Sequence, residues 1–350
     1  MNLISGILLH GVGAMFASVC YTPQKATRAW SWQTYWLMQA AVCWLILPLL
    51  VAWLTIPHLM QVLAEAPRSA MWISFVLGVL YGVGGTAFGL AIRYVGFSLT
   101  YAISVGISCV LGTLLPPLYS GKLAEVLSGT GSGWILVGVG IGAAGIALCG
   151  IAGYLREKSG ATAATSRPSF SLRIGLPLCL LSGVLSALYG FSLDQGQPIA
   201  DVAAKHGAGN FQINVIYIFS NTGAFLSTMV YCIYLHVKQK SFAEYRSVRR
   251  VPEAGSNTLP LNYLLACLTG VLWYSQFFFY GLGHVRMGTY KFTSWAIHMI
   301  MLVLISTLVG LAFKEWSGIS SATRLYLILA IAVLVAAVVS LTYGNYLGQF

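Results

Sequence analysis

Ten apolar runs, each close to the roughly 20 residues that cross a bilayer as a helix, occupy most of the chain. They fall near residues 3–21, 34–54, 71–93, 98–119, 133–153, 172–193, 212–236, 260–282, 289–313 and 324–343. Of the 350 residues, 58% are hydrophobic and 8% are charged, so the short links between the runs leave no room for a water-soluble domain. Strand-like alternation over about 10 residues is missing. The sequence therefore predicts an all-α integral membrane protein with ten transmembrane helices in contact with membrane lipid.

The basic residues are divided unequally between the links that join consecutive runs. The even-numbered links and their edges hold few of the 19, namely Arg68, Lys122, Lys205, Arg286 and Lys291. Because Lys and Arg are enriched in cytoplasmic links, the odd-numbered links are predicted to be cytoplasmic and both termini to lie on the opposite side. This bias also explains the net charge of +11 without a nucleic-acid partner. No cationic segment precedes Leu3, so the first run is expected to stay in the mature protein.

The two halves of the chain resemble each other. Residues 1–155 and 172–350 are predicted to be two five-helix repeats, joined by a cytoplasmic linker at 156–171. The third run, from Gly78, reads GVLYGVGGTAFGLAIRYVG, and the eighth, from Gly270, reads GVLWYSQFFFYGLGHVRMG. Because five is an odd number, the second repeat must cross the membrane upside down, which is the arrangement of alternating-access transporters. Chance similarity between two glycine-rich helices is the alternative.

The two aligned runs carry different side chains. The third has glycines at a spacing that lets helix backbones approach closely, namely Gly78, Gly82, Gly85 and Gly89. The eighth is rich in aromatic residues. One half is therefore predicted to supply close packing and the other to supply the side chains of a site. A further aromatic segment, SWQTYW from Ser31, follows two basic residues at a membrane entry and is predicted to be an interfacial aromatic belt.

Trp273, Gln276 and Tyr280 follow spacings of three and four residues, so they share one face of the eighth helix, with His284 at its end. An aromatic ring can lie against the C–H face of a pyranose while an amide and a phenol pair with its hydroxyl groups. This face is therefore predicted to bind a neutral sugar. A helix-packing stripe with a polar end is the alternative interpretation.

All eight acidic residues fall in links or at helix ends, which argues against a cation antiporter or a carboxylate proton relay. His10 and His298 lie inside apolar runs instead. Because histidine titrates near neutral pH, these two are candidate proton carriers, with neutral histidines hydrogen-bonded between helices as the alternative. The seven cysteines have no CxxC spacing, and HExxH and GxSxG motifs are absent from the sequence. We therefore expect no metal site, no cofactor and no enzyme activity.

Several blocks occur in an order that is found in known proteins. They are LLHGVG around His10, WSWQTYW from Trp30, YGVGGTAFGLAIRYVG from Tyr81, ISVGISCVLGTLLPPL from Ile103, QPIAD from Gln197, WYSQFFFYGLGHVR from Trp273, SWAIHM from Ser294 and KEW from Lys314. In these blocks, over nearly its whole length, the chain resembles the L-rhamnose-proton symporter family of the drug/metabolite transporter superfamily.

That resemblance implies a five-plus-five inverted helix arrangement in the bacterial inner membrane, with periplasmic termini. It implies proton-driven import of L-rhamnose, with L-lyxose or another 6-deoxy or related sugar as further candidates. The sugar site would then be lined by Tyr81, Trp273, Gln276, Tyr280 and Trp295. Two alternatives remain: an uncoupled metabolite exporter or facilitator of the same superfamily, and a sensory or accessory membrane protein that binds sugar without moving it.

Overall fold

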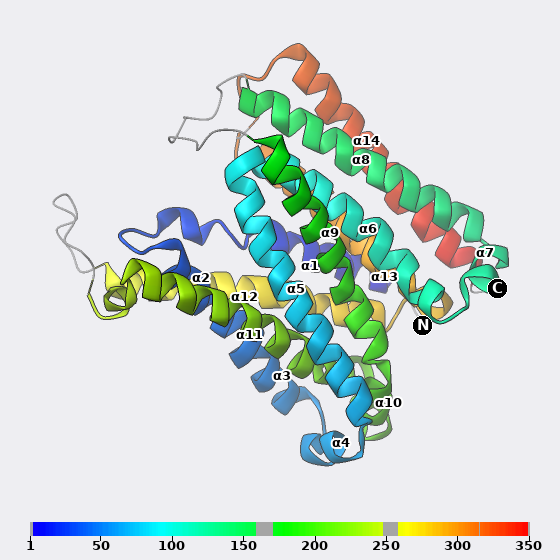
Figure 1. Ribbon diagram of the computed structural model, residues 1–350. Helices are drawn as coiled ribbons and strands as arrows, with labels where there is room; N and C mark the ends of the chain where they lie inside the picture. Colours follow the sequence, from blue (N-terminus) through cyan, green and yellow to red (C-terminus); the bar gives the residue numbers. More distant parts are fainter. Residues whose placement is uncertain (1–2, 159–170, 248–257, 315, 349–350) are drawn as a thin grey trace.

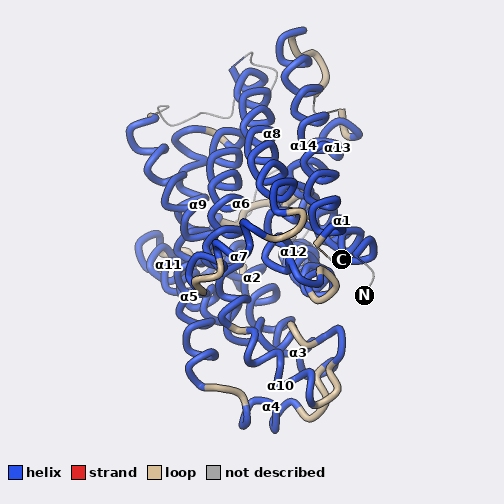
Figure 2. Tube along the Cα trace, turned by 90° about the vertical axis from the view of Figure 1, so that its right-hand side faces the viewer, coloured by secondary structure: helices blue, strands red, loops and turns tan. Residues whose placement is uncertain are grey.

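The computed structural model describes residues 3–158, 171–247, 258–314 and 316–348, and every regular element in these ranges is helical (Figure 1, Figure 2). The long helices are α1 (Leu3–Val19), α5 (Arg68–Val95), α6 (Phe97–Tyr119), α8 (Ser132–Lys158), α9 (Leu172–Gln195), α11 (Asn214–Gln239), α12 (Leu259–His284), α13 (Ser294–Ala312) and α14 (Ser321–Leu347). One further long segment consists of α2 (Trp32–Ala40), the π-helical turn η2 (Ala41–Ile46) and α3 (Leu47–Thr55). The links carry short helices: η1 (Pro23–Ala26), α4 (Leu59–Glu65), α7 (Leu123–Ser128), α10 (Gln197–Lys205), η3 (Gly209–Phe211), η4 (Phe242–Tyr245) and η5 (Gly288–Thr293).

Nine helical segments in the described part of the chain are apolar and long enough to cross a membrane. The remaining one, α1, is apolar but shorter, at 17 residues. Ten crossings therefore stay a prediction, while a multi-pass helical protein is what the structure supports. Residues 159–170 of the predicted linker lie outside the described residues, and residues 156–158 belong to α8.

The break in the second long segment has a local cause. Proline cannot donate a backbone hydrogen bond, and its ring clashes with the carbonyl group four residues earlier. Pro48 therefore disturbs the carbonyl of Trp44, and the preceding turn is wider than an α-helical turn: the N–H of Leu47 bonds to the carbonyl of Val42, five residues back. Such π-helical turns are often found at functional sites. Here the turn carries the buried Trp44.

The helices of the two halves pack against each other in equivalent pairs. Helix α5 packs on α9 and α11, and α12 packs on α1 and α2. In the same way α6 contacts α9 while α13 contacts α1, and α8 lies beside α14 (Figure 1). The five long segments of the first half correspond, in order, to the five of the second half. Each contact named here between the halves has a counterpart formed by the corresponding segments. The halves are therefore not separately folded units.

Two of the four glycines noted in the third run bring α5 close to α11. A Cβ atom at Gly78 or Gly82 would lie 2.0 Å or 2.6 Å from backbone carbonyl oxygens of α11, so a side chain cannot replace either hydrogen without a backbone shift. The close approach predicted for the other two is wrong. A Cβ atom added at Gly85 would have no described neighbour within 4 Å, and one added at Gly89 would touch only the ring of Trp32, at 3.7 Å, where both residues line a cavity.

Both ends of the described chain lie on one face of the bundle. Gly6 in α1 packs against Gly283 at the end of α12, and Leu347 in α14 packs against Gly131, just before α8. The N and C marks accordingly lie close together in Figure 1 and in Figure 2. This face carries α4, α7 and α10 and is called the even-link face; the odd-link face carries η1 and η4. Which of the two meets the cytoplasm remains a prediction.

Candidate functional site

A cavity of about 130 Å³ lies inside the bundle, between helices of both halves. Its lining includes all five side chains predicted for the sugar site and one of the two histidines, namely Tyr81, Trp273, Gln276, Tyr280, Trp295 and His298. The three residues from α12 share one face of that helix, as their spacing predicts. Because one water molecule needs about 10–15 Å³ of such space, the cavity has room for several waters or a small solute.

Trp273 is surrounded by aromatic rings from distant parts of the sequence. Its ring centroid lies 5.2 Å from that of Tyr21, 5.5 Å from Trp36 and 5.1 Å from Trp44, all edge-on. Trp36 is 7% exposed and lies among these rings inside the bundle. The interfacial belt predicted for most rings of its segment stays a prediction. These contacts could not be read from spacing, because α2 and α12 meet only in the folded protein.

Trp295 is held between one helix of each half. Its indole Nε1 donates to the carbonyl oxygen and to the hydroxyl oxygen of Ser108, at 3.0 Å and 3.1 Å. Gly112 and Gly190 flank the ring so closely that added Cβ atoms would lie 2.4 Å and 2.9 Å from it. The orientation of this ring is therefore determined by α6 and α9, although the residue itself belongs to α13.

The two predicted proton carriers meet at one tyrosine. The ring centroid of Tyr280 lies 5.1 Å from that of His10 and 5.3 Å from that of His298, and the two imidazoles are 5.9 Å apart. Both histidines are buried, at 0% and 3% exposure. Both ring nitrogens of His10 and the Nδ1 of His298 have no hydrogen-bond partner among the described residues. The alternative of neutral histidines satisfied by neighbouring helices therefore finds no support at these three atoms.

A second cavity, of about 210 Å³, lies next to the central one toward the even-link face. Tyr280 and Trp295 line both cavities, so these two side chains separate them. Four ionisable side chains line this outer cavity, namely Asp194, Asp201, His284 and Lys291. The sequence places His284 at the end of the predicted sugar-binding face. Asp194 at the end of α9, Asp201 in α10 and Lys291 in η5 join it only in the folded protein, so spacing along the chain does not connect them.

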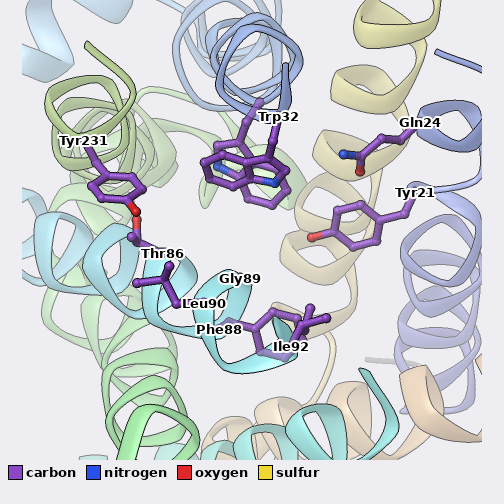
Figure 3. Close-up of a pocket in the computed structure, with 10 residues that line it drawn as sticks. Tyr21, Gln24, Trp32, Thr86, Phe88, Gly89, Leu90, Ile92 and Tyr231 are labelled. Carbon is purple, nitrogen blue, oxygen red and sulfur yellow. The ribbon is translucent and has the colours of Figure 1, made fainter. Parts of the chain in front are cut away.

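A third cavity, of about 430 Å³, lies toward the odd-link face (Figure 3). It is bounded by η1, the start of α2, the end of α5 and Tyr231 of α11. Tyr21 and Phe88 line both this cavity and the central one. The three cavities thus form a series that runs from one face of the bundle to the other. We call this third space the vestibule.

Metal binding finds no support in the side chains. Within residues 3–158, 171–247, 258–314 and 316–348, no group of three His, Cys, Asp or Glu residues is placed to hold a metal ion. The site is instead made of aromatic rings, one amide and hydroxyl groups, with imidazoles beside it. Such a lining suits a neutral, polyhydroxylated solute better than an ion, because it offers hydrogen bonds without a buried net charge.

Comparison with known proteins agrees with this chemistry. Residues 1–346 match the family model described as L-rhamnose-proton symport protein (RhaT). A protein of Yersinia pestis named L-rhamnose-proton symporter is 33% identical over 316 residues, which cover 90% of each chain. One of Cronobacter sakazakii with the same name is 34% identical over 313 residues, which cover 89% of each chain. These relatives are named as transporters rather than as enzymes.

Proposed function

Because the chain belongs to the L-rhamnose-proton symport protein family, we propose that it imports L-rhamnose, or a closely related sugar, together with protons across the bacterial inner membrane. A symporter moves its two solutes, here sugar and proton, across the membrane in the same direction. The family model also covers nearly the whole chain, residues 1–346. We further place the family in the drug/metabolite transporter superfamily, on the basis of the sequence resemblance described above.

The observation that carries the proposal is the central cavity. Trp273, Gln276 and Tyr280 line one side of it and Trp295 another. Its lining residues are all uncharged, apart from the imidazole of His298. Indole and phenol rings can pack against the apolar face of a pyranose, and Gln276 can both donate to and accept from sugar hydroxyls. A 6-deoxy sugar adds a methyl group, which an aromatic lining accommodates without an unpaired polar atom.

Alternating access requires two arrangements of similar energy around one site, and inverted repeats supply them. The equivalent packing of the two halves supports this model. In this structure the vestibule, toward the odd-link face, is larger than the outer cavity. We infer that this structure represents the arrangement in which the central site opens mainly toward the odd-link face. If the odd-numbered links are cytoplasmic, as their basic residues predict, this arrangement faces inward.

Proton coupling is assigned to the His10, Tyr280 and His298 cluster. One proton moving inward with a neutral sugar contributes about 2.3 kcal/mol per 100 mV of membrane potential. His298 lines the sugar cavity, whereas His10 contacts His298 and Tyr280 without lining it. Protonation next to the sugar can therefore change the affinity of the site. An uncoupled exporter or facilitator would leave these unpaired imidazole nitrogens without a role.

The test is transport by the purified protein in proteoliposomes. Labelled L-rhamnose should be taken up in counterflow, and each addition of external sugar should make the outside medium more alkaline. L-Mannose, which carries a hydroxymethyl group in place of the methyl group, serves as the comparison sugar, and protein-free liposomes serve as the blank. Failure to take up any L-rhamnose would reject the substrate. Uptake without alkalinisation would reject proton coupling and leave the uncoupled facilitator.

A further inference from the structure

The vestibule is a lined pocket that the proposed central site does not use. It is the largest of the three cavities described, and the side chains around it are uncharged. They are Tyr21, Gln24, Trp32, Trp36, Thr86, Phe88, Leu90, Ile92 and Tyr231. An ion or an anionic metabolite would find no opposite charge in this lining. A neutral ligand with one apolar face is the chemistry that it fits.

One wall of the vestibule consists of stacked aromatic rings. The ring centroids of Trp32 and Trp36 are 5.0 Å apart, with 20° between the ring planes. Tyr21 stacks on Trp36 at 6.1 Å and 8°. Figure 3 shows Trp32 on one side of the open space and Tyr21 on another. The outer ring of such a stack keeps one flat face that can lie against the C–H face of a sugar ring.

Polar groups surround this aromatic wall. Gln24 lies on one side of the space and Tyr231 on the other, next to Thr86 (Figure 3). The half-buried side chains of Gln24 and Tyr231 both line this space. An amide and a phenol can each donate and accept, so together they can pair with several sugar hydroxyls. A lipid acyl chain in the same place would leave both groups unpaired, which is unfavourable.

The aromatic wall is held in position from outside the pocket. The carboxylate of Glu244, in η4, accepts hydrogen bonds from the backbone N–H and the hydroxyl of Ser31, both at 2.7 Å, and from the hydroxyl of Thr34. Gln33 donates to the hydroxyl of Ser241 at 2.8 Å. Trp32 lies between these anchored residues. A binding surface fixed before the ligand arrives loses less entropy on binding.

We propose that the vestibule is a second sugar site, which binds one neutral pyranose in addition to the sugar in the central cavity. The inference rests on the proposed function, since the sugar would be the transported one on its way between the central cavity and the odd-link face. Tyr21 and Phe88, which line both cavities, separate the two sites. Gln24, Trp32 and Tyr231 are the residues assigned to the second site.

The experiment counts the sugars bound to each chain. The full-length protein is placed in lipid nanodiscs, and labelled L-rhamnose binding is measured by equilibrium dialysis. Wild type is compared with Gln24→Leu in the vestibule, with Gln276→Leu in the central cavity, and with Gln61→Leu, an exposed residue of α4, as the matched control. We expect two sugars per chain for wild type and the control. Each cavity variant should weaken one of the two sites several-fold, up to about tenfold, and leave the other site at wild-type affinity.

The outcomes separate the two proposals. If wild type binds one sugar and Gln24→Leu binds it equally well, the second site is rejected while the transport proposal stands. If Gln24→Leu loses both sugars although its thermal melting matches that of wild type, independent sites are rejected. If wild type binds no L-rhamnose, the proposed function itself fails. Native mass spectrometry gives a further check, because it detects lipid that stays bound to the protein. If one lipid is retained in the presence of L-rhamnose and is lost in the Gln24→Leu variant, the vestibule is a lipid site and the proposal is rejected.

Discussion

The imidazole rings of His10 and His298 lie 5.9 Å apart, one in α1 and the other in α13, and Tyr280 contacts both. The two histidines thus connect the first half of the chain to the second at the edge of the central cavity. Any movement of α1 relative to α13 would change the distance between them. Three of their buried ring nitrogens have no hydrogen-bond partner among the described residues. The affinity of this pair for a proton would therefore depend on the distance between the two rings.

The first prediction concerns coupling. Replacing His298→Gln keeps a side chain that can form hydrogen bonds but cannot carry a proton near neutral pH. With one proton per sugar, a potential of 100 mV supports about 50-fold accumulation in wild type. We expect the variant to lose this accumulation and only equilibrate L-rhamnose, with counterflow preserved within about twofold. The measurement is labelled uptake in proteoliposomes with and without an imposed gradient.

The control for this variant is His206→Gln. The Nε2 of His206 lies 2.8 Å from a carboxylate oxygen of Glu65 near the even-link face, away from the central cavity. It should accumulate sugar as wild type does. Accumulation by His298→Gln at the wild-type level would remove this histidine from the coupling mechanism.

The second prediction tests the position of Trp295. A methyl group at Gly190 would lie 2.9 Å from the indole, so Gly190→Ala must displace the ring or α9. Overpacking of this kind costs about 1–3 kcal/mol, and if the transport step bears this cost, uptake should be about 5-fold to 100-fold slower. Gly140→Ala in α8 is the control, because its added methyl group has no described neighbour within 4 Å. Wild-type uptake by Gly190→Ala would show that the ring position does not matter for transport.

The third prediction concerns sugar recognition. Gln276→Leu conserves the approximate size of the side chain and removes the amide that we assign to sugar hydroxyls. Loss of such a hydrogen bond costs about 0.5–1.5 kcal/mol, so the KM for L-rhamnose should rise several-fold, up to about tenfold. The neighbouring Ser275→Ala, whose hydroxyl bonds to the backbone of Val271 on the exposed side of α12, should leave KM unchanged. Equal KM values for the Gln276→Leu variant and wild type would exclude the amide from the site.

The fourth prediction concerns stability. Glu244→Ala removes the acceptor of three hydrogen bonds to the start of α2. Hydrogen bonds to a charged group contribute about 1.5–3 kcal/mol, and we expect destabilisation in that range and a lower melting temperature in detergent. Glu125→Ala, an exposed residue of α7, is the comparison and should melt like wild type. A melting temperature that Glu244→Ala leaves unchanged would show that these bonds add nothing to the folded state.

The fifth prediction concerns orientation. Alkaline phosphatase fused after Phe350 should be active, because this enzyme folds only outside the cytoplasm, and green fluorescent protein fused at the same place should stay dark. Fusions made after Lys158, on the odd-link side, should give the opposite result. Fluorescence of the C-terminal fusion would invert the predicted topology, and with it the assignment of the vestibule to the cytoplasmic side.

The helical fold was largely predictable from the sequence, because membrane helices can be recognised by the length and apolar character of their runs. The face of Trp273, Gln276 and Tyr280 was predictable for the same reason, since it depends on spacing within one helix. What the sequence did not reveal depends on contacts between helices. The rings around Trp273 come from the turn after α1, from α2 and from η2. The packing role assigned to Gly89 was wrong because glycine spacing does not tell whether a helix or a cavity faces it.

The place of Trp295 between Gly112 and Gly190 has a mechanical consequence. The indole fills the gap between two helices of different halves, and its nitrogen is bonded to Ser108 on one of them. Helices α6 and α9 therefore cannot slide past each other while the ring stays still: either the ring turns with them or its bonds to Ser108 break. Opening the outer cavity and reshaping the wall of the sugar cavity would then be one event, so that the sugar cannot be exposed to both sides of the membrane at once.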